Sequence, residues 1–153
     1  MKANIIAPVI IITALLAVSV FSTVSFINEK REHERVIRRY DSEITEVCRT
    51  ALTAIEDYKK DGSDAAYGWL TASVGAMQAL IHSKYYFDKD GLLIMNLECH
   101  KCRRNLIDYK EDSVKHLDLL SEALRFYIDG NADTFTWRLQ SFNTGVEQER
   151  IKE

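Results

Sequence analysis

The sequence has very few residues that interrupt helices. It contains one proline and six glycines among 153 residues, and long stretches contain neither. An all-β domain needs frequent turn residues between its strands, so this scarcity argues against one. We therefore expect an all-α fold.

The sequence also lacks the motifs that would identify an enzyme. It contains no HExxH, no G-x-S-x-G and no glycine-rich phosphate loop. None of its four histidines follows a glutamate by three residues, which is the spacing of carboxylate-bridged metal sites in helical bundles. We predict a protein that is not an enzyme, with no catalytic residue and no cofactor.

One long stretch lacks charge altogether. Residues 5–27, IIAPVIIITALLAVSVFSTVSFI, contain no Asp, Glu, Lys, Arg or His. As a helix this stretch would be about 35 Å long, enough to cross a hydrocarbon core of about 30 Å. We therefore predict that residues 1–27 are a single-pass membrane anchor, followed by one domain over residues 28–148 and a charged tail over residues 149–153.

A cleaved signal peptide is the alternative for the same stretch. Met1 and Lys2 form a short basic start, and Ala17 to Ser19 are small enough for a cleavage site. The apolar run is longer than the roughly 7 to 15 residues of a signal peptide, which favours an uncleaved signal-anchor.

The side of the membrane is harder to predict. Five basic residues follow the anchor, whereas only Lys2 precedes it, and this bias would place the domain in the cytoplasm. A short amino-terminal tail before an apolar run is instead typical of an anchor that exports the domain after it. We lean slightly toward the extracytoplasmic (periplasmic) side and leave the orientation open.

The residues next to the anchor are candidates for contact with a membrane surface. Basic side chains are attracted to anionic lipids, and aromatic side chains favour the interface. The candidates are Lys30, Arg31, Arg35, Arg38 and Arg39, together with Tyr85, Tyr86 and Phe87. The alternatives are a solvated helix face with glutamates as ion-pair partners, and packing of the aromatic residues in the core.

Apolar residues recur at helical spacing through the rest of the chain. They predict helices over residues 28–60, 64–87, 91–128 and 132–148, with the first helix continuing directly from the anchor. Turn residues separate them, including Asp88 to Gly91. Short connections imply antiparallel neighbours, so we expect a four-helix up-down bundle. The polar segment 108–113 could break the third helix, but we expect that helix to be continuous.

The second predicted helix has two unlike faces and no charge from Ala65 to Ile81. One face is large and apolar. The other is small, and it comprises Ala65, Gly68, Ala72, Gly75 and Ala79. Small residues allow a neighbouring helix to approach closely. The helix could be buried centrally in its own bundle, could present a surface for self-association or a partner protein, or could cross the membrane, for which its length is minimal.

The three cysteines form the only recognisable metal or redox pattern. Cys99 and Cys102 lie on the apolar seam of the third predicted helix, and the expected register brings Cys48 to their level. Cysteines on such a seam behave as small core residues. A disulfide is an alternative in an exported domain, and a zinc site is another, although no fourth ligand lies near. We predict core cysteines and no metal.

These observations predict a membrane-anchored helical interaction or sensory module that binds a partner protein or a small ligand of unknown identity. A structural or envelope-spanning spacer subunit of a membrane complex is the first alternative, and a metal- or thiol-dependent protein is the second. The domain lacks the dense basic surface of a nucleic-acid-binding protein.

Overall fold

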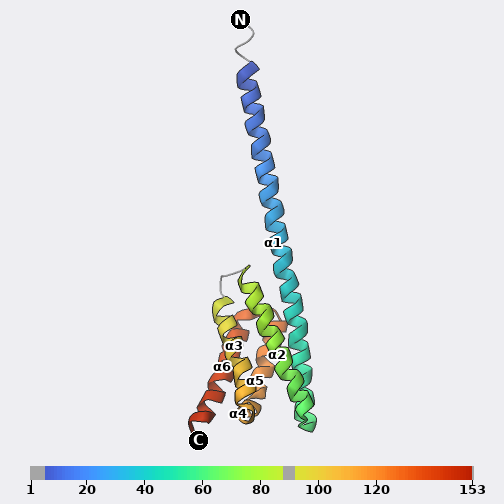
Figure 1. The fold of residues 1–153 in the computed structure, drawn as a ribbon, viewed down its shortest axis with the longest axis vertical. Helices are drawn as coiled ribbons and strands as arrows, with labels where there is room; N and C mark the ends of the chain where they lie inside the picture. Colours follow the sequence, from blue (N-terminus) through green and yellow to red (C-terminus); the bar gives the residue numbers. More distant parts are fainter. Residues whose placement is uncertain (1–5, 88–91, 153) are drawn as a thin grey trace. The chain divides into compact units, whose positions relative to one another are not determined.

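The computed structural model describes residues 6–87 and 92–152, with side chains from Leu15 onward. The described residues form six α-helices and no strand, so the all-α prediction is confirmed (Figure 1). The helices are α1 (Ile6–Asp61), α2 (Asp64–Tyr85), α3 (Leu92–Asp108), α4 (Lys110–Lys115), α5 (Leu117–Ile128) and α6 (Ala132–Lys152). The turn predicted at residues 88–91 lies outside the described residues.

The structure does not support the predicted membrane anchor. Within the part of the chain that is described, no helix is both long enough and apolar enough to span a membrane. The predicted anchor falls partly on residues 1–5, which are not described, and on residues 6–14, whose side chains are not described. The anchor therefore remains a prediction from the sequence.

The chain divides into two compact units, Met1–Arg38 and Arg39–Glu153. The described part of the first unit is helical throughout, and the second unit contains a helical bundle. In α1 the first fully buried side chain is that of Ile44. The α1 side chains from Leu15 to Arg35 are all exposed.

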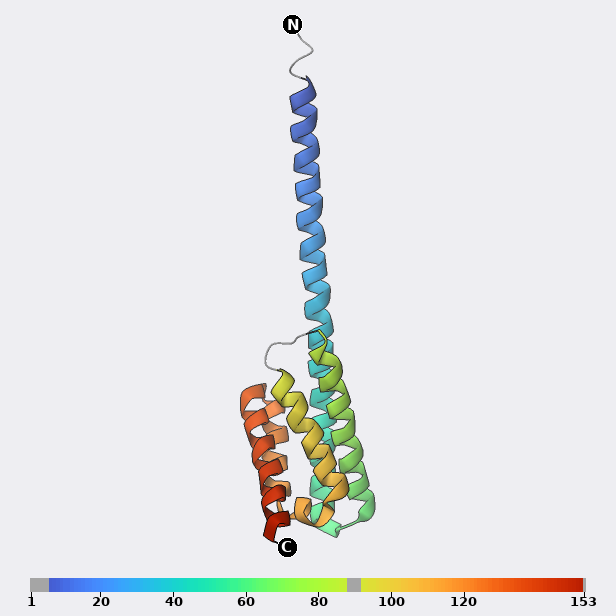
Figure 2. The same cartoon turned by 60° about the vertical axis from the view of Figure 1, so that its left-hand side comes forward.

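Five helices of the second unit surround one core (Figure 2). The second half of α1 lies against α2, where Cys48 Sγ is 3.5 Å from Met77 Sδ, and against α5, where Glu56 pairs with Arg125 at 3.7 Å. α2 packs on α3, α3 on α6, and α6 on α5, which closes the ring. The predicted four-helix bundle is therefore wrong in its helix number.

The error comes from the segment predicted as one helix over residues 91–128, which is three helices. α3 ends at Asp108, and Tyr109 leaves the helical region with φ −133° and ψ 57°. No fully buried apolar side chain lies between Leu106 and Leu117, so the apolar seam of a single straight helix is interrupted in this segment. Instead Ser113 is fully buried and donates from Oγ to the Asn105 carbonyl at 2.9 Å. This turn lets α5 return antiparallel to α6.

Two glycines end helices in the left-handed backbone region, Gly62 with φ 67° and Gly130 with φ 79°. At Gly130 the following Asn131 N–H donates to the Phe126 carbonyl at 2.9 Å, which closes the carboxyl end of α5. Only glycine adopts this conformation without a steric cost from Cβ.

Gly130→Ala is therefore expected to lower the free energy of unfolding by about 1 to 2 kcal/mol. Gly68 is the matched control, because it lies inside α2 and a Cβ there would meet no atom within 4 Å. Gly68→Ala should raise stability by about 0.5 to 1 kcal/mol, since alanine favours a helix interior. Urea denaturation of the full chain in detergent measures both, and equal signs for the two variants would contradict the expectation.

Candidate functional site

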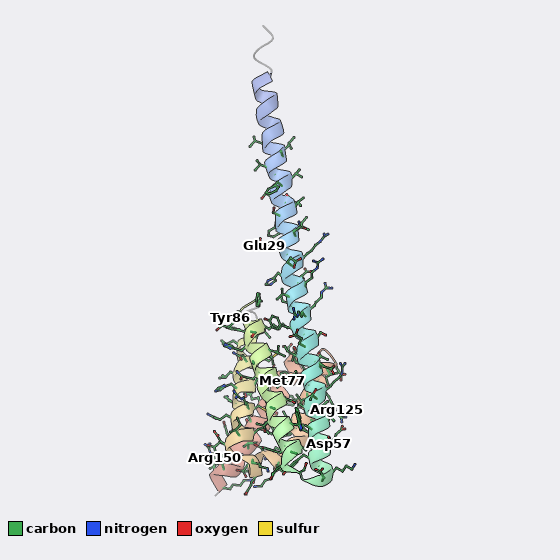
Figure 3. The ribbon with its side chains drawn as sticks, turned by 45° about the vertical axis from the view of Figure 1, so that its right-hand side comes forward. Glu29, Asp57, Met77, Tyr86, Arg125 and Arg150 are labelled. Atoms are coloured by element: carbon green, nitrogen blue, oxygen red, sulfur yellow. The ribbon has the colours of Figure 1, made fainter. Side chains whose placement is uncertain are left out.

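The small-residue face of α2 lies on the outside of the bundle. Ala65, Gly68, Ala72 and Ala79 are exposed, and Gly75 is half-buried beneath Arg103, whose Nε would lie 3.4 Å from an added Cβ. The large residues of α2 point the other way, into the core, as Met77 does in Figure 3. We call the surface formed by Ala65, Gly68, Ala72, Ala76 and Ala79 the α2 outer face; all five residues are exposed.

The two edges of the α2 outer face differ in character. On the α1 side, Trp69 is 68% exposed and lines a groove with Glu46, Arg49 and Asp57. On the α3 side, most of the exposed residues are basic or apolar, namely Leu93, Leu97, His100, Arg103 and Ile107, whereas Asp108 at the end of α3 is acidic and Arg104 pairs with Glu147 of α6 at 3.9 Å. Exposed apolar side chains that gather on one side of a domain usually mark a surface for a partner.

The predicted membrane-surface residues are mostly exposed and partly paired. In the first unit Arg35 bonds to Glu32 at 2.7 Å and Arg38 lies 3.6 Å from Glu34. In the second unit Arg39 bonds to Glu43 at 2.8 Å. Such exposed pairs within one helix contribute little to stability. Lys30 and Arg31 are exposed as well.

The aromatic candidates divide into one half-buried and two exposed side chains. Tyr85 packs against the core, whereas Tyr86 and Phe87 are 66% and 46% exposed at the end of α2 (Figure 3). The Phe87 ring lies 5.8 Å from that of Tyr40. Exposed Leu93 and Ile94 begin the next helix, so the apolar surface at this end is larger than the sequence pattern predicted.

The three cysteines are free and fully buried within the core. Cys48 donates a weak hydrogen bond from Sγ to Met77 Sδ at 3.5 Å. Among the described residues, no three His, Cys, Asp or Glu side chains are arranged to hold a metal ion. Burial raises the pKa of the Cys48 thiol to about 12 and also raises the pKa values of Cys99 and Cys102. Thiols of this kind react slowly, because the nucleophile is the thiolate.

These raised pKa values predict a loss of stability at alkaline pH. In the unfolded chain the thiols ionise near pH 9.0, whereas Cys48 in the folded chain keeps its proton to about pH 12. Between these values the folded state binds more protons, so stability falls as pH rises by up to about 1.4 kcal/mol per pH unit for each thiol. Urea denaturation from pH 8 upward measures the slope. Cys48→Ala should make the slope shallower, and an unchanged slope would contradict this explanation.

A polar network joins α3 to α6 inside the bundle. Glu98 is 3% exposed, and its Oε2 accepts from Asn143 Nδ2 at 2.8 Å. Asn143 Oδ1 accepts from Asn105 Nδ2 at 3.1 Å, and Lys101 bonds to Glu98 Oε1 at 2.8 Å. Because these pairs have fixed partners, they set the register in which α3 and α6 run side by side in the same direction.

A second polar group, which the sequence pattern did not reveal, lies on three helices near the carboxyl end of α2. Lys84 Nζ donates to Asp41 Oδ1 at 2.6 Å, and Tyr127 OH donates to the same oxygen at 3.0 Å. Lys84 follows Met77 and Ile81 at helical spacing, so it occupies a core position of α2. In the sequence, a charged residue at a core position of α2 was the one sign of this group. The sequence did not show that Asp41 of α1 and Tyr127 of α5 are the partners.

The fold and these surfaces define the class of the protein as an all-α helical-bundle domain. Comparison of the chain with protein-family models, with curated proteins and with solved structures found no match.

Proposed function

We propose that the chain is a membrane-tethered interaction module whose bundle binds a second protein helix through the α2 outer face. The observation that carries the proposal is the uncharged and exposed character of this face from Ala65 to Ala79, which is formed by small residues apart from Trp69 at its α1 edge. Small residues at a helix contact allow two helices to pack closely. Because this face is exposed to water, it is free to contact a second helix.

Membrane attachment is the second part of the proposal. Every side chain from Leu15 to Ile27 is exposed, and Phe21 and Phe26 are 75% and 69% exposed. Transfer of these side chains from water into lipid is strongly favourable. The uncharged residues that precede them in the sequence extend the same apolar segment to Ile5.

The partner that the charges favour is a second copy of this chain. The face carries no charge, so two copies can approach without repulsion. Its α3 edge is basic through Arg103, whose side chain lies over Gly75, and its α1 edge has Glu46 and Asp57 against one arginine. If two α2 helices pack in parallel about a two-fold axis, the basic edge of each copy lies opposite the acidic edge of the other.

Cysteine cross-linking tests the interface, because the native thiols are buried. Ala72→Cys puts a reactive thiol at the centre of the face, and Thr144→Cys puts one on the exposed side of α6. With a bifunctional maleimide in membranes, Ala72→Cys should give a covalent dimer and Thr144→Cys should not. Ala72→Arg should abolish dimers in sedimentation experiments. Equal dimer yields from both cysteine variants, or adducts to other proteins only, would refute the second copy as partner.

Membrane attachment is tested separately by alkaline extraction of cell membranes. The full chain should stay in the membrane pellet. A variant that carries both Val20→Arg and Phe21→Arg should move to the supernatant, since each central arginine opposes insertion by about 3 kcal/mol. The matched control is Arg31→Glu with Arg35→Glu, which leaves the apolar segment intact. Release of the unmodified chain by alkaline extraction would refute the anchor.

A further inference from the structure

A cavity lies between the helices on the inner side of α2, separate from the α2 outer face. Its volume is about 380 Å³, within the range of small-molecule sites. It is lined by Asp41, Thr45, Lys84, Leu92, Met95, Tyr127, Ile128, Gly130 and Ala132. These residues come from α1, α2, α3, α5 and the start of α6, so the complete fold is needed to form it.

The polar side of the cavity carries both charge signs. The Lys84 side chain is 11% exposed and the Asp41 side chain 46% exposed. Both hydrogen bonds to Asp41 end on Oδ1, and no donor in the described part of the chain bonds to Oδ2. An ammonium group can donate three hydrogen bonds, and Lys84 uses one of them within the described residues. The pair therefore has an acceptor and donors left for a ligand.

The start of α6 adds a positive end to the same cavity. Ala132 is the first residue of this helix, whose 21 residues align their peptide dipoles. Asn131 Oδ1 caps one amide by accepting from Thr134 N at 3.1 Å, and the first amides of a helix have no partner within it. Lys84 and the start of α6, whose first turn also carries Asp133, favour an anionic group, and Asp41 favours a cationic group beside it.

Apart from the hydroxyls of Thr45 and Tyr127, the remaining side chains of the lining are apolar. Leu92 and Met95 of α3 are 6% and 4% exposed, and Ile128 of α5 is half-buried. A ligand that fits both sides has a carboxylate and an ammonium at one end and an aliphatic group at the other.

We propose that this cavity binds a small α-amino acid with an aliphatic side chain. The ligand carboxylate meets Lys84, the Thr45 hydroxyl and the start of α6, and its ammonium meets Asp41 Oδ2. The aliphatic group packs on Leu92, Met95 and Ile128. The pair of Asp41 and Lys84 borders the cavity that admits this ligand.

Calorimetric titration of the full chain in detergent with L-leucine tests the site. Binding is expected, and isopentylamine and 4-methylpentanoate, which each keep one charged group, should bind at least about tenfold more weakly. Asp41→Asn and Lys84→Met should each weaken leucine binding at least about tenfold. Ile128→Trp should weaken it too, by filling the cavity without touching the ion pair.

The matched control is the exposed pair between Lys59 and Asp118, which also joins α1 to α5. Lys59→Met and Asp118→Asn should leave leucine binding unchanged, and urea denaturation confirms that each variant folds. The proposal is overturned if neither leucine nor any other aliphatic amino acid binds at millimolar concentration. It is also overturned if the amine or the acid alone binds as tightly as leucine, or if Ile128→Trp folds and binds normally. The cavity contains no residue of the α2 outer face. Ala72→Arg should therefore bind leucine normally even if it prevents dimerisation.

Discussion

Phe142→Ala is expected to lower the free energy of unfolding by about 4 kcal/mol, because a large aromatic side chain is lost from the centre of the core. Phe142 lies in α6 and is fully buried in the same core as Leu139 and Val146. Truncation to alanine removes the transfer free energy of the ring and leaves a cavity that close-packed neighbours only partly fill. Because small domains are stable by only about 5 to 15 kcal/mol, this change approaches the limit of folding.

The measurement is urea denaturation of the full chain in detergent, followed by circular dichroism. The midpoint should fall while the slope of free energy against urea stays the same, which shows that the two-state transition is retained. Trp137→Ala is the control, because Trp137 belongs to the same helix but is 57% exposed. It should change stability by no more than about 0.5 kcal/mol. Similar losses for the two variants would refute the assigned orientation of α6.

Asn143→Leu is expected to lower the free energy of unfolding by about 3 kcal/mol, although leucine is apolar and the site is buried. Asn143 donates from Nδ2 to Glu98 Oε2 and to the Glu98 carbonyl, at 2.8 Å and 3.0 Å. Without these bonds the buried Glu98 carboxylate keeps only Lys101 as a partner within the described structure. A buried group that loses its partner costs the desolvation of that group, which exceeds the net value of an intact hydrogen bond.

The double variant Glu98→Met with Asn143→Leu distinguishes this explanation from poor packing. It removes the buried charge together with its donor, and Lys101 is exposed enough to return to water. The double variant should be at least as stable as Asn143→Leu alone, with a favourable coupling of about 2 kcal/mol in the double-mutant cycle. Additive losses would show that Glu98 does not depend on Asn143.

Apolar and polar core residues contribute to the fold in different ways. Burial of the apolar Phe142 side chain stabilises this fold, but it would stabilise many other arrangements of the helices as well. Glu98, Asn105 and Asn143 accept only certain partners, and Asn105 Oδ1 stays buried without a partner in the described structure. The network therefore serves best as a constraint on how α3 lies against α6.

The helices themselves were largely predictable from the sequence. The ends of α1 and α5 follow from Gly62 and Gly130, and the inward face of α2 follows from the spacing of Leu70, Val74 and Met77. The break at Asp108 was not predicted, because a polar segment in a helix pattern fits an exposed turn of helix as well as a reversal of the chain. The choice between them depends on whether Leu117 and Leu124 reach the core, and this depends on the other helices.

The same division applies to the candidate sites. The small face of α2 and its lack of charge are properties of local sequence, so most of its residues were grouped before the structure was known, whereas the structure replaced half-buried Gly75 with exposed Ala76. Whether that face is inside or outside the bundle depends on how many helices surround the core. The Asp41, Lys84 and Tyr127 group could not be predicted, because 43 residues separate the first pair and 86 separate Asp41 from Tyr127.

The sequence by itself determined that this protein is helical, where most of its helices end, and which face of each helix is apolar. These properties depend on residues within one or two turns of each other, through spacing, capping and backbone conformation. Only the tertiary structure decided that five helices close the core, that the α2 outer face meets water, and that opposite charges line one cavity. Those outcomes depend on contacts between distant segments, where the burial of apolar area and the pairing of buried polar groups select one arrangement.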